Sequence, residues 1–145
     1  MQRLQALPRL WAPGVSQLVD QQAEFVQMVG RLIAFAGEHQ YQLRFGDAFR
    51  STDPLACPHC QRTVTYQGLL QANGRSKVAY SKHNDRKAVD FLIAKIDGEM
   101  NDQDYRVLGE YWESLGGRWG GRFGVAKAEF GARLGWDKNH FELSV

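Results

Sequence analysis

The sequence has no long apolar run and little net charge, and both shortages narrow the class of protein. Its longest apolar runs, Leu32–Ala36 and Phe91–Ala94, fall well short of the roughly 20 residues of a transmembrane helix, so stable membrane insertion is not expected. The formal charge is only +2, and no Lys/Arg-rich run is interleaved with aromatic residues. Nucleic-acid binding is therefore not indicated.

The N-terminus lacks the apolar core of a signal peptide, because Arg3 and Arg9 stand among scattered leucines and prolines. We therefore expect a protein that is made and kept in the cytoplasm until it is released. A hydrophobic share of 43% over 145 residues suffices for one compact domain with a real core. Residues 1–14 are expected to form an irregular lead-in to this single domain, and the protein is expected to be a monomer.

Cysteine is scarce, because Cys57 and Cys60 are the only two, in Cys57-Pro58-His59-Cys60. A four-cysteine zinc site would need two more, and no thioredoxin-like βαβ pattern surrounds the pair. His59 could add a third ligand, but a fourth is not evident. The pair could be half of a structural zinc site, a redox pair or two ordinary thiols, and it does not have the pattern of an active site.

Periodic patterns predict an α+β domain, a small and mainly antiparallel sheet with helices packed on it. Helical spacing of apolar residues predicts a helix over Ser16–Ala36 that ends at Gly37. A second helix is predicted over Gln103–Leu115, with Asp102 as its cap. Residues 63–72 could form a helix or a strand. Strands are predicted at Tyr41–Phe45, Ala88–Ile93 and His140–Leu143.

His83 and Asp90 stand seven residues apart, on either side of a turn-forming pair, Asn84-Asp85. Seven extended residues would separate the two side chains by roughly 23 Å, so they can serve one site only if the chain bends. Asp90 lies within the apolar run Ala88–Ile93. A buried carboxylate needs a basic partner or a metal, and the residues alone leave both explanations open.

A second stretch, near the C-terminus, supplies Asp137 and His140. Catalytic zinc commonly takes three protein ligands from His and Asp or Glu and leaves a fourth position for water. His83, Asp90 and His140 would supply two nitrogens and one oxygen. Asp137 would then be a spare carboxylate where a general base for that water belongs. Glu142 shares a strand face with His140, so it could orient that ligand or be an exposed edge carboxylate.

Two motifs resemble those of the zinc D-alanyl-D-alanine carboxypeptidase and phage L-alanyl-D-glutamate endopeptidase family. They are Ser81-x-His83-x6-Asp90 and Asp137-x-x-His140-Phe141-Glu142. Segments that also resemble the phage lysis enzymes are Phe49–Ser51, Leu108–Trp112 and Trp119–Phe123. The similarity runs from about Leu43 to Glu142.

The resemblance implies a peptidase of the bacterial peptidoglycan stem peptide, with Zn2+ on His83, Asp90 and His140 and with Asp137 as the base. It also implies a phage lysis enzyme that a separate pore-forming protein releases from the host cytoplasm to the periplasm and cell wall. Asp137 favours the L-alanyl-D-glutamate bond, because wall carboxypeptidases of the family more often have Glu at this position.

Three other functions remain possible alternatives to this interpretation. A D-alanyl-D-alanine carboxypeptidase is the alternative within the family. A non-catalytic, metal-containing wall-binding or phage structural module would belong to another class, and so would a metal or redox module centred on Cys57 and Cys60.

Three residues are candidates for substrate binding. Arg50 would by composition be a solvated surface charge, whereas the resemblance implies that it holds a substrate carboxylate or the developing oxyanion. Ser81 could present its hydroxyl to the substrate or be an ordinary turn residue. Trp119 precedes two glycines, which suits either a cleft wall or a plain turn. One position departs from the family, because Arg86 stands where many members have glycine three residues after the first histidine.

Overall fold

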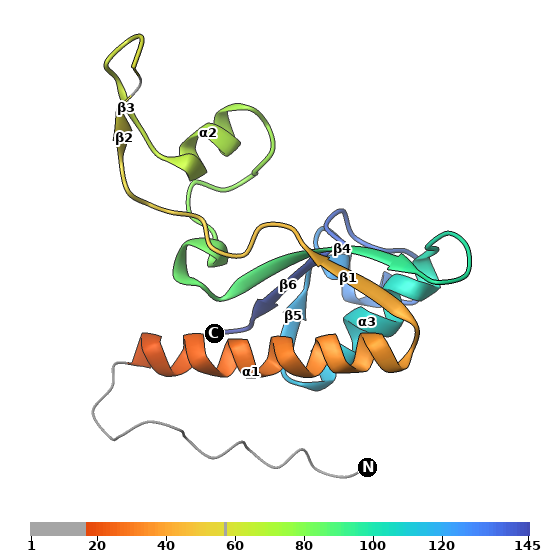
Figure 1. The fold of residues 1–145 in the computed structure, drawn as a ribbon. Coiled ribbons are helices and arrows are strands. Elements are labelled where there is room, and N and C mark those ends of the chain that lie inside the picture. The colour runs from red at the N-terminus through yellow and green to blue at the C-terminus, as the bar shows by residue number, and fades with distance from the viewer. Residues whose placement is uncertain (1–16, 57) are drawn as a thin grey trace.

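The computed structural model describes residues 17–56 and 58–145. Its architecture is α+β, as the sequence predicts, with an antiparallel sheet in the order β1-β4-β6-β5 and a separate β2–β3 hairpin (Figure 1). The helices are α1 (Gln17–Glu38), α2 (Tyr66–Ala72) and α3 (Asp102–Ser114). The strands are β1 (Tyr41–Phe45), β2 (Leu55–Ala56), β3 (Thr63–Val64), β4 (Ala88–Lys95), β5 (Gly117–Trp119) and β6 (His140–Leu143). Short 3₁₀ helices are η1 (Lys82–Asp85), η2 (Gly120–Arg122) and η3 (Lys127–Glu129).

The helix boundaries differ from the predictions at the end of α1 and at both ends of α3, which stops at Ser114 rather than Leu115. α1 continues through Gly37 to Glu38, and the left-handed residue falls later, at Gln40 with a φ of 64°. α3 begins at Asp102 and is capped by Asn101, whose side chain accepts from the backbone N–H of Asp104. The predicted lead-in 1–14 and the start at Ser16 lie outside the described residues. Within the described part, no helix is both long and apolar enough to cross a bilayer.

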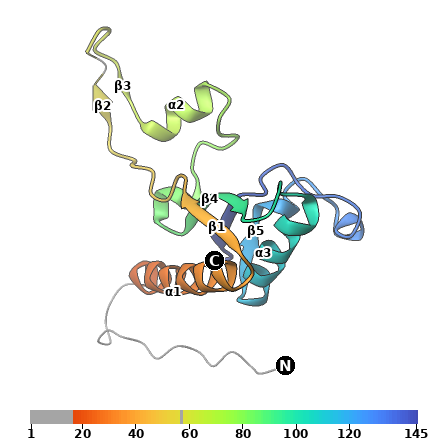
Figure 2. The same ribbon diagram turned by 45° about the vertical axis from the view of Figure 1, so that its right-hand side comes forward.

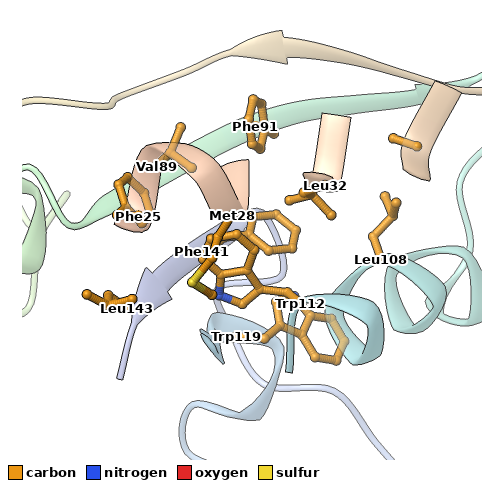
Figure 3. Packing of buried hydrophobic residues seen from close by; sticks show 11 residues of the cluster. Phe25, Met28, Leu32, Val89, Phe91, Leu108, Trp112, Trp119, Phe141 and Leu143 are labelled. Atoms are coloured by element: carbon orange, nitrogen blue, oxygen red, sulfur yellow. The ribbon is translucent and has the colours of Figure 1, made fainter. Parts of the chain in front are cut away.

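The core lies between the sheet and the pair α1 and α3, as Figure 3 shows. Because strand side chains alternate, Val89 and Phe91 of β4 and Phe141 of β6 point into this core. Asp90, which lies between Val89 and Phe91, and His140, which precedes Phe141, must then lie on the opposite face of the sheet. The helices therefore cover one face and leave the other for polar groups.

Two fully buried tryptophans fix the end of the chain against this core. The indole N–H of Trp112 donates to the Glu142 carbonyl (2.9 Å), and that of Trp119 donates to the Lys138 carbonyl (2.8 Å). Trp119 packs against Gly109, where any added Cβ would lie 2.0 Å from the indole. Burial of each large side chain stabilises the fold by roughly 2–3 kcal/mol, so β6 and the loop before it are held firmly.

Residues 51–56 and 58–81, which we call the arm, carry β2, β3 and α2 away from the body of the molecule. Both views place the arm on the side of the sheet opposite α1 (Figures 1 and 2). The chain enters and leaves the arm at one point, because the Arg50 N–H donates to the His83 carbonyl (3.2 Å) and Asn84 Nδ2 donates to the Arg50 carbonyl (2.9 Å). Residues 63–72, which the sequence leaves open, contain both a short strand and a helix.

Candidate metal centre

The bend that the sequence requires between His83 and Asp90 is the 3₁₀ helix η1. The Ser81 hydroxyl caps η1 by accepting from the His83 N–H (3.3 Å), and Asn84 Oδ1 accepts from the Ser81 N–H (2.7 Å). Arg86 then adopts a left-handed conformation with a φ of 57° and sends the chain into β4. His83 is thereby buried beneath the arm's base, with 1% of its surface exposed.

The register of β4 and β6 brings the other two predicted ligands together, because Asp90 lies directly opposite His140. His140 Nδ1 is 2.9 Å from Asp90 Oδ1, and His83 Nε2 is 3.2 Å from each of these two atoms. Three ligand atoms thus converge on the sheet face away from the helices. The group His83, Asp90 and His140 could hold a metal ion.

The nitrogen of each histidine that points away from this centre has its own acceptor. The Ala48 carbonyl lies 3.0 Å from His83 Nδ1, and Glu142 Oε2 lies 2.9 Å from His140 Nε2. Arg118 in turn donates to Glu142 (3.1 Å). An acceptor at the outer nitrogen fixes the ring orientation and leaves the inner nitrogen free to bind a metal. Of the two roles left open for Glu142, its contacts match that of orienting His140, and it is buried rather than exposed.

Asp90 and His140 together show a preference for positive charge at the point where they meet. Burial by itself would raise the pKa of Asp90, but hydrogen bonds with His140 and His83 hold it well below its ordinary value. Burial would lower the pKa of His140, but its hydrogen bonds with Asp90 and Glu142 raise it to about 9. Either a proton or a cation would meet that preference.

Asp137 stands beside the three converging atoms, with its Oδ2 3.9 Å from His140 Nδ1. Its side chain is partly exposed, and burial is the main cause that raises its pKa above the ordinary value. The loop that carries Asp137 rests on Gly120. A Cβ added to Gly120 would lie 2.2 Å from the Asp137 carbonyl oxygen and 2.8 Å from His140 Cβ. Only glycine lets this loop approach so closely.

Arg50 lies at the same centre, but its guanidinium is already engaged. Nε donates to Asp47 (2.9 Å), Nη1 donates to Gln67 (3.3 Å), and Nη2 lies 3.6 Å from Asp90 Oδ2. The side chain is 11% exposed, so Arg50 is not the solvated charge that composition favours. Its substrate role stays a prediction.

The other two predicted substrate residues have evident structural contacts. Ser81 caps η1, and its substrate role also stays a prediction. Trp119 has no exposed surface and lies in the core rather than on a cleft wall, because Gly109 and Gly121 make room for its ring. Cys60 is exposed, and Cys57 lies outside the described residues.

Sequence reasoning missed two residues whose contacts reach residues in or next to the site, Gln67 and Lys77. Gln67 is buried in the arm and donates to both Ser76 Oγ and the Val78 carbonyl (2.8 Å each), while its oxygen accepts from Arg50. Lys77 places its ammonium 4.4 Å from the ring centre of Trp136. No periodicity or motif marks either residue, although an exposed Trp136 directly before Asp137 could have been noted.

The fold and the cluster together define an α+β domain with a candidate metal centre on the sheet face opposite its helices. No protein-family model matches the chain, and no curated protein matches it. Among solved structures it is similar to the L-Ala D-Glu endopeptidase ChiX of Serratia marcescens, with 16% identity and a TM-score of 0.46. The similarity covers 89% of this chain and 87% of that one. A likeness this distant establishes neither family nor function, so the functional conclusion rests on the site itself.

Proposed function

We propose that this protein is a zinc-dependent peptidase that hydrolyses an amide bond in the stem peptide of bacterial peptidoglycan. The observation that carries the proposal is the convergence of His83, Asp90 and His140, with Asp137 beside them as a carboxylate that the ligand set does not use. The resemblance of the two sequence motifs to wall peptidases supplies the substrate.

The spacing of the three ligand atoms suits zinc. Ligands bound about 2.0–2.1 Å from a tetrahedral zinc ion lie about 3.3 Å from one another. The observed separations of 2.9 Å and 3.2 Å need only a small outward movement to reach this value. Two imidazoles and one carboxylate also match catalytic zinc sites, which keep a fourth position open. A purely structural zinc site would have all four positions filled by protein ligands, and a spare carboxylate such as Asp137 would then have no function there.

Each residue then has a distinct task. His83, Asp90 and His140 would hold the zinc ion, which would supply a Lewis acid for the scissile carbonyl and would lower the pKa of the attacking water. Asp137 accepts the proton of that water and delivers it to the leaving amine. Arg50, oriented by Asp47, places positive charge beside the site, where it can stabilise the developing oxyanion.

We further propose L-alanyl-D-glutamate as the bond, because Asp137 matches the residue of the phage endopeptidases at the base position. In this proposal the enzyme acts in phage lysis, and it reaches the wall after release from the host cytoplasm. Removal of the terminal D-alanine is the alternative reaction.

Mass analysis of purified peptidoglycan fragments after incubation with the zinc-loaded protein tests the proposal. Cleavage at L-alanyl-D-glutamate frees the stem peptide with D-glutamate at its new amino terminus. A carboxypeptidase would instead shorten the stem by one alanine. Asp137→Asn serves as the matched control for a contaminating hydrolase. If the zinc-loaded wild type leaves all fragments unchanged, the peptidase proposal is wrong and a non-catalytic module is favoured.

A further inference from the structure

A buried side chain of the arm, Gln67, is hydrogen-bonded to Arg50 beside the candidate metal centre. Its amide oxygen accepts from Arg50 Nη1, and its amide nitrogen donates to Ser76 and Val78. Gln67 is only 2% exposed, so these bonds are protected from water and hold the arm at a fixed place beside Arg50. The residue between the two bonded positions is Lys77.

Lys77 reaches back from the arm to the other side of the site. Its ammonium lies 4.4 Å from the ring centre of Trp136, and Trp136 directly precedes Asp137 in the chain. The chain neighbours of Lys77, Ser76 and Val78, accept from Gln67, which in turn accepts from Arg50, while Lys77 itself contacts Trp136. The ammonium of Lys77 thus contacts the residue that directly precedes the proposed base.

The charge of Lys77 differs from that of three cations that belong to or adjoin the candidate centre, because each of these three is paired with a carboxylate. Arg50 pairs with Asp47, Arg118 with Glu142 and Lys138 with Asp102. For Lys77, the described residues supply the Trp136 ring as its partner and no carboxylate within ion-pair distance. A cation held on an aromatic face is oriented but keeps its capacity to pair with an anion.

We propose that Lys77, seated on Trp136, binds the free carboxylate that lies nearest the scissile amide of the substrate. This inference rests on the proposed peptidase function, and it names the substrate group that the arm recognises. In the stem peptide D-glutamate is linked onward through its side-chain carboxyl, so its α-carboxylate is free and adjacent to the L-alanyl amide. Trp136 keeps the long, flexible lysine side chain in place, which lowers the entropy lost on binding.

Two synthetic stem peptides test the subsite, one with the α-carboxylate of D-glutamate and one with the corresponding amide. The two peptides are otherwise identical, so they differ only in the negative charge that Lys77 is proposed to bind. The kcat/KM of the zinc-loaded wild type should be roughly fivefold higher for the carboxylate peptide, the size expected of a partly exposed ion pair. Lys77→Gln should bring the ratio of the two kcat/KM values close to one, and Lys77→Arg should keep the preference. Lys127→Gln, which removes an exposed lysine from η3, is the matched control and should behave as wild type.

Binding of both peptides to zinc-loaded Asp137→Asn, measured by calorimetry, gives a readout that does not need turnover. The same preference should appear there and should vanish when Lys77→Gln is added. The subsite is wrong if the carboxylate preference is absent, if Lys77→Gln retains it, or if Lys127→Gln removes it equally. Cleavage without a preference would overturn the subsite alone. Preferential binding without cleavage by the wild type would overturn the peptidase proposal and leave the subsite standing.

Discussion

Gly120 offers the sharpest test of how the fold supports the site, through the substitution Gly120→Ala. The added Cβ would lie 2.2 Å from the Asp137 carbonyl oxygen, 2.8 Å from His140 Cβ and 3.0 Å from Asp137 Cβ. An ordinary contact is about 3.4 Å or more, so the loop must retreat by roughly 1 Å. The nearest atom belongs to the backbone, and a side-chain rotation cannot relieve the clash.

The cost of this substitution follows from the overlap. Overpacking of this kind costs about 1–3 kcal/mol, and the smaller entropy of the unfolded alanine chain offsets about 0.4–1 kcal/mol of it. We therefore expect a loss of about 1–2 kcal/mol in the free energy of unfolding. A displacement of about 1 Å at the reacting groups also predicts a fall in turnover of the order of 10²-fold.

Urea unfolding, zinc content and the rate of wall hydrolysis should be measured on the same preparations of each variant. Gly131→Ala is the matched control, because a Cβ at Gly131 meets nothing within 4 Å and its φ is not positive. If Gly120→Ala equals Gly131→Ala in all three measurements, the close contact does not constrain the site. If only stability falls, Gly120 serves packing and the link to catalysis is refuted.

Three further predictions concern the centre and its turn. His140→Ala should lose both zinc and activity. Asp137→Asn should still bind about one zinc per chain, but its turnover should fall roughly 10²–10⁴-fold. If metal analysis shows that both variants lose zinc equally, Asp137 is a ligand rather than the base. In the metal-free protein, the hydrogen bonds with Asp90 and Glu142 outweigh burial and raise the pKa of His140 to about 9. Their contribution to the free energy of unfolding should be complete below about pH 6.5 and should be lost as the pH rises through 9. Urea titrations of the zinc-loaded protein, made in parallel, should not show this loss of stability. Arg86→Gly should be more stable than Arg86→Ala by about 1 kcal/mol, because only glycine adopts a φ of 57° without strain; equal unfolding midpoints would contradict this reason.

The sequence predicts the elements of the site better than their arrangement. β6 begins and ends where alternation predicts, and the bend after His83 occurs where Asn84-Asp85 predicts a turn. Local signals suffice there because turn chemistry and side-chain alternation act over a few residues. The pairing of Asp90 with His140 depends on the register of two strands far apart in the chain, which no local pattern specifies.

Trp119 shows why the remaining features could not be predicted. The two following glycines suit a cleft wall or a plain turn, yet one of them and Gly109 of α3 form the space that receives the indole. Gln67 is similar, because its burial arises from partners in the arm and at Arg50 that meet only in the folded chain. Both outcomes are decided by tertiary packing rather than by propensity.

The closed base of the arm makes it an insertion that can change length without disturbing the sheet. Arg50 is bonded to His83 and Asn84 where the arm leaves and rejoins the body, so β1 and η1 would stay in place around a shorter or longer connection. The entropy of closing a loop grows only slowly with its length, about 0.6 kcal/mol for each doubling. If the protein is the peptidase proposed above, exchange of the outer part of the arm, with Gln67 and Ser81 kept, should alter specificity while His83, Asp90 and His140 stay in place.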